Sequence, residues 1–450
     1  MPDPERPTAP SQPGAVPLLE PLVAHVQARL ARITQPGQTL TAAFSGGLDS
    51  TVLLHLLARV APALGLTLRA AHVHHGLQAC ADGWAAHCAA VCEALAVPLT
   101  TLQVSVDVTH GGGVEAAARD ARHKALRTLG GDWLVLAHHR GDQAETLLHR
   151  LSRGCGVHGA AAMREADLRG GSPGLLRPLL DTPRSALHAW AEAADLSWIE
   201  DPSNADTHFS RNFIRHEVLA TLNARFPGAE AALARATGHF DEAAGLLDEL
   251  ASIDHTALAR EGGLSRTGLL ALSDARLRNL LRSRLAAHGY AAPDTDQLTE
   301  ALRQLRTAAG PWRARFGAWA LCVEDDSVWF ECASLPAAGP DCVWQGEALL
   351  RWGDVELHFA PTPSNGLQVQ PGSLMLSARR GGERLRPDPT RPARDLKTLA
   401  RSAGIPPWWR AAMPVFRQAG KVVGWGGIWD AGLRGSDGWH ITIRRPNAKF

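Results

Sequence analysis

The sequence S-G-G-L-D-S at residues 45–50 constrains the fold of this chain more than any other stretch. A β-prone apolar run at 40–44 precedes it, and apolar residues at helical spacing follow it at 52–57. The order is therefore strand, tight turn and helix. Such a turn directs backbone N–H groups and a helix N-terminus at one point, and its two glycines let an anion approach closely. The turn is predicted to bind a phosphate.

The same residues limit this prediction. No lysine lies in the turn, so it is not the G-x-x-x-x-G-K-[ST] nucleotide-binding loop. The hydroxyl groups of Ser45, Ser50 and Thr51 add donors for a phosphate oxygen. Asp49 and Ser50 belong to residue types that cap helices, so the turn alone is also compatible with a helix start that binds nothing.

Apolar runs alternate with helical patterns between residues 18 and 226. The predicted strands are 39–44, 67–73, 99–104 and 133–137. Strands separated by helices of about ten or more residues indicate a doubly wound, parallel α/β sheet. Ligands of such sheets bind beyond the carboxyl ends of the strands, at the point where the strand order reverses. We therefore expect functional residues just after these runs.

Polar motifs do follow two of the predicted strands. H-V-H-H-G-L at 72–77 ends the second strand, and H-H-R-G-D-Q-A-E-T at 138–146 follows the fourth. Asp142 and Glu145 fall three residues apart, so they share a helix face just after a strand end. Carboxylates there complement the helix dipole, but they also suit a metal ion or an ammonium group.

Further motifs carry arginine. Glu115, Arg119 and Arg122 stand at i, i+4 and i+7, so they share one helix face. They either form a solvated pair within the helix or present arginine to a phosphate. W-I-E-D-P-S-N at 198–204 and R-N-F-I-R at 211–215 combine acids, amides and guanidinium groups within a short stretch.

Composition bounds the class of protein. A chain of 450 residues exceeds what one core usually supports, so two or three domains are expected. The 46 basic and 45 acidic residues nearly cancel, which excludes a uniformly basic surface but not local patches. No run approaches the roughly 18 apolar residues of a membrane span, so no membrane partner is expected. Seven cysteines without a C-x-x-C pair indicate reduced thiols in a cytoplasmic protein. The Pro-rich residues 1–17 are predicted to be a disordered tail.

Taken in order, these motifs resemble those of the tRNA(Ile)-lysidine synthetase family, a branch of the N-type ATP pyrophosphatases. The resemblance rests on S-G-G-L-D-S, H-V-H-H-G-L, E-A-x-A-R-x-x-R, H-x-x-D-Q-x-E-T, R-P-L-L, W-I-E-D-P-S-N and R-N-x-x-R. It implies an adenine nucleotide alpha hydrolase-like doubly wound sheet, a helical middle domain and a small α+β C-terminal domain. It also implies a ligase that uses ATP and Mg²⁺ to adenylate the C2 oxygen of the cytidine at position 34 in the CAU anticodon of tRNA(Ile). Free lysine would then displace AMP, which changes codon reading from AUG to AUA.

The resemblance assigns roles to residues of these motifs. ATP would be held by Ser45, Gly46, Gly47, Leu48, Asp49, Ser50, His72 and His139. Catalysis would involve Asp49, Arg119, Asp142 and Glu145, with the metal ion on Asp49 and Asp142. Candidates for lysine and tRNA contacts are Glu115, Arg122, Asp201, Asn204, Arg211, Asn212 and Arg215, and, near the C-terminus, Arg379, Arg380, Arg384 and Lys397.

One position departs from the family pattern. The family usually has two adjacent aspartates before the glutamine of its fourth motif, and this chain has Gly141 in place of the first. One carboxylate is therefore missing. Either Asp142 and Glu145 are sufficient to hold magnesium or the substrate amine, or Asp201 compensates.

The chain is predicted to divide into four segments after the tail. These are a catalytic domain at 18–226, a mainly helical domain with a β hairpin at 227–332, a linker with a β-prone stretch at 333–376 and a tRNA-binding domain at 377–450. Residues 377–401 carry eight basic and three acidic residues, a net charge of +5 that suits phosphate binding. Trp408 and Trp409 either stack on bases or anchor a small core. A homodimer and a monomer are both compatible with these patterns.

Two other functions fit parts of the sequence. A tRNA thiolase on the same pyrophosphatase core would need a reactive cysteine, and Cys155 lies near the cleft motifs in the sequence. A tRNA-binding protein with an inactive nucleotide site would fit the carboxylate lost at Gly141. The intact loop at 45–50 favours an active ATP site over the binding protein.

Overall fold

The computed structural model describes residues 16–74, 81–104, 114–168, 171–202, 206–260, 263–290, 293–307 and 309–444, without the side chains of 16–18 and 114–120. The predicted tail at 1–17 lies outside the described residues, apart from its last two, which begin a helix. The chain divides into two compact units, residues 1–245 and 246–450. Among the described residues, no helix is both long and apolar enough to cross a membrane.

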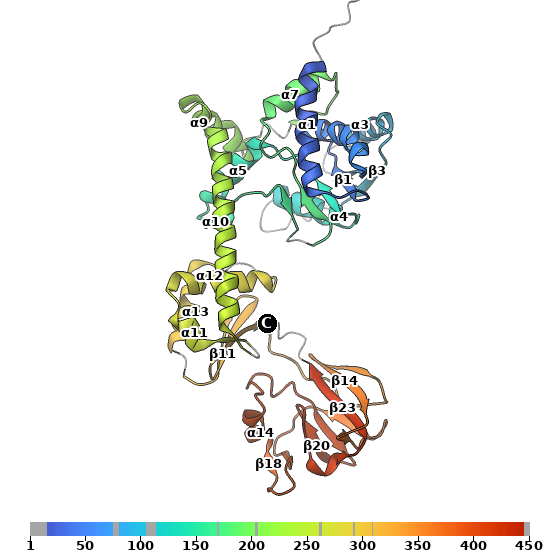
Figure 1. Cartoon of the computed structure of the whole chain (residues 1–450), viewed down its shortest axis with the longest axis vertical. Coiled ribbons are helices and arrows are strands. Elements are labelled where there is room, and N and C mark those ends of the chain that lie inside the picture. The colour runs from blue at the N-terminus through green and yellow to red at the C-terminus, as the bar shows by residue number, and fades with distance from the viewer. Residues whose placement is uncertain are drawn as a thin grey trace, which may run out of the picture. The chain divides into compact units, whose positions relative to one another are not determined.

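The first unit, coloured blue to green in Figure 1, is built on a six-stranded sheet with strand order β3-β2-β1-β4-β6-β5. Its strands are β1 (Thr39–Ala43), β2 (Thr67–His74), β3 (Leu99–Gln103), β4 (Trp133–Val135), β5 (Ala166–Asp167) and β6 (Gly174–Leu176). Neighbouring strands are parallel, except that β5 is antiparallel to β6. The chain steps outward from β1 to β3 and returns to the other side of β1 with β4. The predicted doubly wound sheet is therefore confirmed, and its strand order reverses between β1 and β4.

Helices cover both faces of this sheet. The helices of the first unit are α1 (Val16–Ile33), α2 (Leu48–Val60), α3 (Ala81–Ala94), α4 (Val114–Arg127), α5 (Arg140–Leu151), α6 (Val157–Ala160), α7 (Arg184–Ala193), α8 (Ser210–Phe213), the π-helical turn η3 (Ile214–Val218), α9 (Leu219–Arg225) and the start of α10 (Ala229–Leu258). On one face, Leu53 of α2 and Trp190 of α7 join the core with residues of α1 and α3. On the other face, Leu126 of α4 packs against Leu134 of β4. Burial on both faces explains why β4, with all three residues buried, is a continuous apolar run.

The second unit begins with a helical and β module. Its helices are α11 (Arg266–Ala271), α12 (Asp274–Ala287) and α13 (Thr295–Thr307), and its strands are β7 (Ala259–Arg260), β8 (Gly263–Ser265), β9 (Trp312–Phe316), β10 (Trp319–Glu324) and β11 (Ser327–Cys332). The strands form an antiparallel sheet of order β7-β8-β11-β10-β9. Leu280, Leu302 and Leu321 meet in the core between the helices and the sheet. The sheet thus extends the β hairpin expected from the sequence.

The C-terminal part of the second unit contains two antiparallel sheets. The first has the order β12-β16-β19-β20-β21 and the second β13-β14-β23-β15-β22. Their strands are β12 (Cys342–Val343), β13 (Leu349–Trp352), β14 (Val355–Thr362), β15 (Gly366–Leu367), β16 (Leu374–Ser377), β19 (Val415–Gln418), β20 (Lys421–Trp425), β21 (Ile428–Trp429), β22 (Arg434–Gly435) and β23 (Gly438–Arg444). A separate two-stranded ribbon consists of β17 (Arg384–Leu385) and β18 (Arg394–Asp395), and helix α14 (Leu396–Ser402) follows it. Residues 342–377 therefore share sheets with strands of residues 415–444, whereas the sequence predicted a linker with a β-prone stretch at 333–376, separate from the domain at 377–450.

A buried carboxylate joins the two parts of the second unit. Glu331 of β11 is 3% exposed, and its Oε1 accepts hydrogen bonds from Trp329 Nε1 at 2.9 Å and from Trp409 Nε1 at 2.7 Å. The ring of Trp408 lies 5.5 Å from that of Trp329. Both tryptophans of the G-I-P-P-W-W-R segment thus pack against β11, so they act as anchors of the fold.

Replacing Trp409 with phenylalanine is expected to lower the free energy of unfolding of the second unit by about 1–3 kcal/mol. Phenylalanine fills most of the space but removes the N–H that the buried Glu331 carboxylate accepts. Trp408→Phe is the matched control, because Trp408 Nε1 is buried without a hydrogen-bond partner among the described residues. Urea unfolding of the intact chain measures both variants, and equal losses would contradict the role given to the Trp409 N–H.

Candidate active site

The loop at 45–50 follows β1 and lies beside β4, where the strand order reverses. Gly46 has φ = +83°, a conformation that favours glycine, and Gly47 caps the N-terminus of α2. Ser50 Oγ donates a hydrogen bond to the Gly47 carbonyl oxygen at 2.9 Å, and Thr51 Oγ1 donates to the same oxygen at 3.0 Å. Hydroxyl groups that the sequence suggested as phosphate donors therefore brace the loop itself.

Ile199, within the W-I-E-D-P-S-N motif, forms one wall of this loop. The Ile199 N–H donates to the Gly46 carbonyl oxygen at 2.9 Å, and Ile199 pairs with Gly47 in an isolated parallel bridge. A Cβ atom on residue 46 would lie 2.6 Å from Ile199 Cδ1 and 3.1 Å from Cys88 Sγ. Close packing and backbone conformation thus both require glycine at this position.

Substituting Gly46 with alanine is expected to destabilise the first unit by about 1–3 kcal/mol, because the left-handed backbone and the contact with Ile199 each oppose a side chain. Gly47→Ala is the control. Its φ is −73°, and the nearest atom to its new Cβ would be Ser45 Oγ at 3.6 Å, an ordinary contact. Urea unfolding compares the two, and a Gly46→Ala protein as stable as Gly47→Ala would refute this account of the loop.

Asp49 lies in the first turn of α2, and three helices begin around it. His139 Nε2, at the N-cap of α5, is 3.9 Å from Asp49 Oδ2, and Arg184 Nε, at the start of α7, is 3.4 Å from Asp49 Oδ1. Asp49 Oδ1 is buried, and although Arg184 is near, the oxygen accepts no hydrogen bond from the described residues. Asp49 therefore lies at the start of one helix and within reach of side chains from the starts of two others.

His139 links this carboxylate to α5. Its Nδ1 accepts a hydrogen bond from the Gly141 N–H at 3.0 Å, while the His139 N–H donates to Asp142 Oδ2 at 2.9 Å. These reciprocal bonds cap α5. Because Nδ1 is an acceptor, a neutral His139 carries its proton on Nε2, which faces Asp49 and Asp142.

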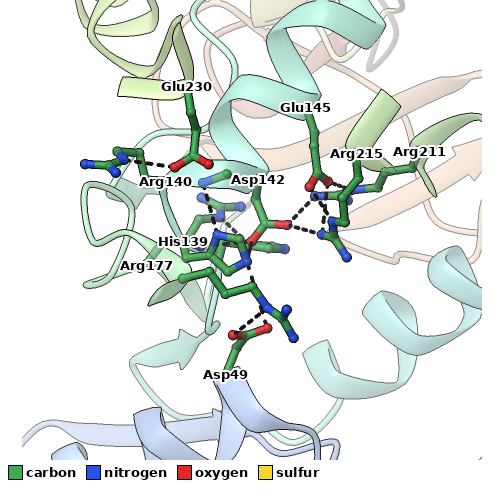
Figure 2. Close-up of polar contacts among 12 residues, drawn as sticks. Asp49, His139, Arg140, Asp142, Glu145, Arg177, Arg211, Arg215 and Glu230 are labelled. Carbon is green, nitrogen blue, oxygen red and sulfur yellow. Dashed lines mark hydrogen bonds and ion pairs between the residues drawn. The ribbon is translucent and has the colours of Figure 1, made fainter. Parts of the chain in front are cut away.

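The R-N-F-I-R motif meets the fourth motif in a network of four charges (Figure 2). Asp142 Oδ1 accepts from Arg211 Nη2 at 2.8 Å. Glu145 Oε2 accepts from Arg211 Nε at 2.9 Å, and Glu145 Oε1 accepts from Arg215 Nε at 2.5 Å. The two carboxylates are 7% and 2% exposed, so two buried acids are neutralised by two arginines.

This network sets the charge state of Asp142. Burial alone would raise the pKa of Asp142, but His139, Arg211 and the His139 N–H together hold it well below its usual range. Burial tends to lower the pKa of Arg215, yet its bonds to Glu145 raise it overall. Both oxygens of Asp142 accept hydrogen bonds in this arrangement, Oδ2 from the His139 N–H and Oδ1 from Arg211.

The other predicted site residues lie at a strand end, on helices or next to the loop wall, or outside the described residues. His72 is 5% exposed, and its Nδ1 lies 3.0 Å from the Phe44 carbonyl oxygen, so its ring packs beside the strand end. Asn212 Nδ2 donates to the Asp206 carbonyl oxygen at 2.9 Å. Half-buried positions hold Arg122 of α4 and Asp201, which follows the loop wall. Outside the described residues are Asn204 and the side chains of Glu115 and Arg119.

The predicted basic residues of the second unit are partly engaged. Arg380 Nη2 donates to Asp341 Oδ2 at 2.7 Å, and Arg384 Nη2 donates to the Ala393 carbonyl oxygen at 2.5 Å. The guanidinium of Arg379 lies 6.0 Å from the centre of the Trp425 ring. Lys397 is exposed on α14.

Two residues of the site were missed in the sequence. Arg184 follows T-P at the start of a helix, and its contact with Asp49 spans 135 positions in the chain. Ile199 lies inside the W-I-E-D-P-S-N motif, but the predicted functional groups of that motif are its acids and amides. Proline before Arg184 marks the helix start and would have placed the arginine in a first turn. No local pattern indicates which loop it faces.

The donors around Asp49 suit a magnesium ion that is bound together with a phosphate. A buried carboxylate oxygen without a hydrogen bond is a suitable ligand, and Mg²⁺ usually takes one or two carboxylates plus phosphate oxygens and water. The described residues contain no group of three or more His, Cys, Asp or Glu side chains arranged for a metal ion. Asp49 is therefore a candidate ligand for such an ion, with the remaining positions left to phosphate oxygens and water.

Three family profiles match the chain. A PP-loop domain matches residues 22–222, a TilS substrate binding domain 264–329 and a TilS substrate C-terminal domain 374–442. The tRNA(Ile)-lysidine synthase of Aromatoleum aromaticum is 47% identical over 399 residues, which cover 87% of this chain and 93% of that protein. The chain belongs to the tRNA(Ile)-lysidine synthase family. The family inferred from the order of the motifs is thereby confirmed.

Further comparisons agree with membership of the synthase family. The tRNA(Ile)-lysidine synthase of an Azoarcus species is 44% identical over 400 residues, 87% of this chain and 88% of that protein. A solved U34-tRNA thiolase from Methanococcus maripaludis aligns at 17% identity with a TM-score of 0.44, over 50% of this chain and 80% of that chain. Membership of the synthase family favours lysidine synthesis over a thiolase or a binding protein.

Proposed function

We propose that this protein joins free lysine to C2 of the cytidine at position 34 of tRNA(Ile) with a CAU anticodon, in an ATP-dependent reaction that releases AMP and pyrophosphate. The observation that carries the proposal is the meeting of a lysine-free glycine loop, Asp49 and a buried acid–arginine network at one point of the sheet. Family membership identifies the reaction for which these parts are suited.

The loop and Asp49 would bind the ATP phosphates and the metal ion. The N-terminus of α2 and the backbone of Gly46 and Gly47 bind the phosphates, because such a turn gathers N–H groups and a positive helix end. Mg²⁺, held by Asp49, would neutralise charge that builds up as pyrophosphate leaves. Adenylation converts the C2 oxygen of the cytidine, which leaves poorly, into part of a good leaving group.

The acid–arginine network serves the amino acid. Its two carboxylates and two guanidinium groups match a zwitterion: Arg211 or Arg215 binds the α-carboxylate of lysine, and Asp142 or Glu145 binds its α-ammonium group. The ε-amine is then oriented toward C2 and displaces AMP. Since its pKa is held low, Asp142 is suited to orienting the amine rather than to taking its proton.

The second unit would bind the tRNA. Residues 377–401 carry a net charge of +5, and Lys397 is exposed there. Arginine and lysine in such a patch bind phosphates with release of counterions, which provides affinity without sequence specificity. Arg379, Arg380 and Arg384 belong to this patch.

Incorporation of labelled lysine into bulk tRNA tests the function. We expect acid-precipitable label that requires ATP and Mg²⁺, with no label from the other amino acids. The Cys155→Ser variant should retain this activity, whereas a thiolase would lose its own. Pyrophosphate release that requires tRNA and lysine together would separate a ligase from a binding protein. Absence of both label and pyrophosphate would refute the proposal.

A further inference from the structure

Arg184 lies next to Asp49 but has no role in the nucleotide binding proposed above. It is the first residue of α7 and follows Pro183, which caps that helix in an extended conformation. Leu187 and Trp190, on the buried face of α7, belong to the core beneath the sheet. The backbone of Arg184 is therefore fixed by a packed helix, while its side chain is 55% exposed and can rotate toward another group.

The present partner of Arg184 is the carboxylate that the metal ion requires. Arg184 Nε lies 3.4 Å from Asp49 Oδ1, without the geometry of a hydrogen bond. A magnesium ion on this oxygen would stand next to the guanidinium, and two like charges at such a distance repel each other. The cation on Asp49 can be Arg184 or a metal ion, but both together are disfavoured.

The triphosphate of ATP is a group that Arg184 could bind once a metal ion occupies Asp49. Phosphate oxygens held at the loop would lie close to Asp49, because Asp49 is in the first turn of the helix that the loop begins. Arginine binds phosphate with two parallel hydrogen bonds, which a lysine cannot reproduce. A long, exposed side chain on a fixed backbone can make this change of partner by rotation about its own bonds.

We propose that Arg184 is a nucleotide-binding residue that neutralises Asp49 in the empty site and moves to the phosphates of ATP when Mg²⁺ binds Asp49. This inference rests on the use of ATP in the proposed function, but it does not depend on lysine or on tRNA. It adds a phosphate-binding cation to a loop that contains no lysine.

Equilibrium binding in the absence of tRNA and lysine tests the proposal. The probes are Mg²⁺ with α,β-methylene-ATP, which cannot be cleaved to AMP, and adenosine, which has no phosphate. We expect Arg184→Ala to weaken binding of the ATP analogue about 10- to 100-fold, the range of a charge-assisted hydrogen bond. Adenosine should bind as it does to the wild type. Arg184→Lys should bind the ATP analogue more tightly than Arg184→Ala but less tightly than the wild type, because it keeps the charge and loses the bidentate geometry.

Arg59→Ala is the matched control. Arg59 is an exposed arginine at the far end of α2, where its guanidinium lies 5.4 Å from the centre of the Trp190 ring of α7. It therefore bridges the same two helices away from the loop, and its loss should leave binding of both probes unchanged. Equal binding of the ATP analogue by Arg184→Ala and wild type would overturn the proposal, as would an equal loss of adenosine binding.

A double-mutant cycle with Asp49→Ala separates direct binding from positioning. If Arg184 contacts the phosphates, Arg184→Ala weakens binding of the analogue in the Asp49→Ala background as well. If Arg184 only holds Asp49 in place, its effect vanishes in that background, and the proposal fails. Should Arg184→Ala not fold, as judged by circular dichroism, Arg184→Lys in both backgrounds decides by the same criterion. Failure of lysine incorporation would leave these binding results intact, so the two proposals fail separately.

Discussion

Asp49→Ala is expected to reduce AMP formation that depends on lysine and tRNA by about a thousandfold or more. The substitution removes the carboxylate assigned to the metal ion and leaves charge on the departing pyrophosphate without compensation, and loss of one such electrostatic contact typically costs two to three orders of magnitude. It also leaves Arg184, whose Nε lies 3.4 Å from Asp49 Oδ1, without this acidic neighbour, whereas His139 keeps Asp142 at 3.6 Å. Single-turnover assays with labelled ATP measure the chemical step directly.

Two comparisons make the Asp49 result specific. Asp49→Asn keeps the shape of the side chain and should be nearly as inactive, because the negative charge is what a metal ion requires. Asp82→Asn changes an acid that is 99% exposed and faces His74, so it should behave as wild type. Activity of Asp49→Ala within tenfold of wild type would show that the metal ion is held elsewhere.

The sequence predicted the sheet well because hydrophobic burial is a local signal. The strands expected at 67–73 and 133–137 are β2 (Thr67–His74) and β4 (Trp133–Val135), so errors are confined to their ends. β5 and β6 have two and three residues and carry no readable periodicity. The short strands β12 and β15 were likewise hidden within Pro- and Gly-rich sequence, since pairing across long separations, rather than local pattern, defines them.

The candidate site was predicted in part for a similar reason. Motifs identified Asp49, Asp142 and Glu145 as acids near strand ends, which chain order alone can indicate. Their partners depend on tertiary packing: Arg211 and Arg215 reach Glu145 across 66 and 70 positions. The sequence therefore identified the acidic groups but not the arginines that neutralise them.

The N-terminal cap of α5 explains why residue 141 is glycine. A Cβ atom on residue 141 would lie 2.9 Å from His139 Cε1, so glycine lets the His139 ring fold over the helix start and accept the Gly141 N–H. Glu230 Oε2 would be 3.7 Å from the same Cβ, and Glu230 Oε1 accepts from Arg140 Nε at 3.0 Å. Figure 2 shows this pair on the side of Asp142 away from Arg211. A carboxylate from α10 thus stands near the place where a side chain at 141 would begin, in contrast to the compensation by Asp201 considered from sequence.

Glu145→Ala is expected to lower the free energy of unfolding of the first unit by about 3–5 kcal/mol, because it leaves buried charge without a partner. Glu145 is 2% exposed and accepts from both Arg211 and Arg215, and Asp142 alone cannot balance two guanidinium groups. Urea unfolding of the intact chain measures the loss. Glu192→Ala is the control, since Glu192 is 63% exposed and pairs with His188 within α7; its stability should match that of wild type.

A second variant separates the structural role of Glu145 from its proposed role in lysine binding. Replacing Glu145 with leucine and Arg215 with methionine removes the charged pair as a whole, and apolar residues of similar volume commonly restore the stability that breaking such a pair costs. We therefore expect Glu145→Leu/Arg215→Met to be more stable than Glu145→Ala while its KM for lysine remains raised by at least about tenfold. If lysine incorporation recovers together with stability, the network only supports the fold. If stability recovers and incorporation does not, the acids and arginines of the network bind the amino acid itself.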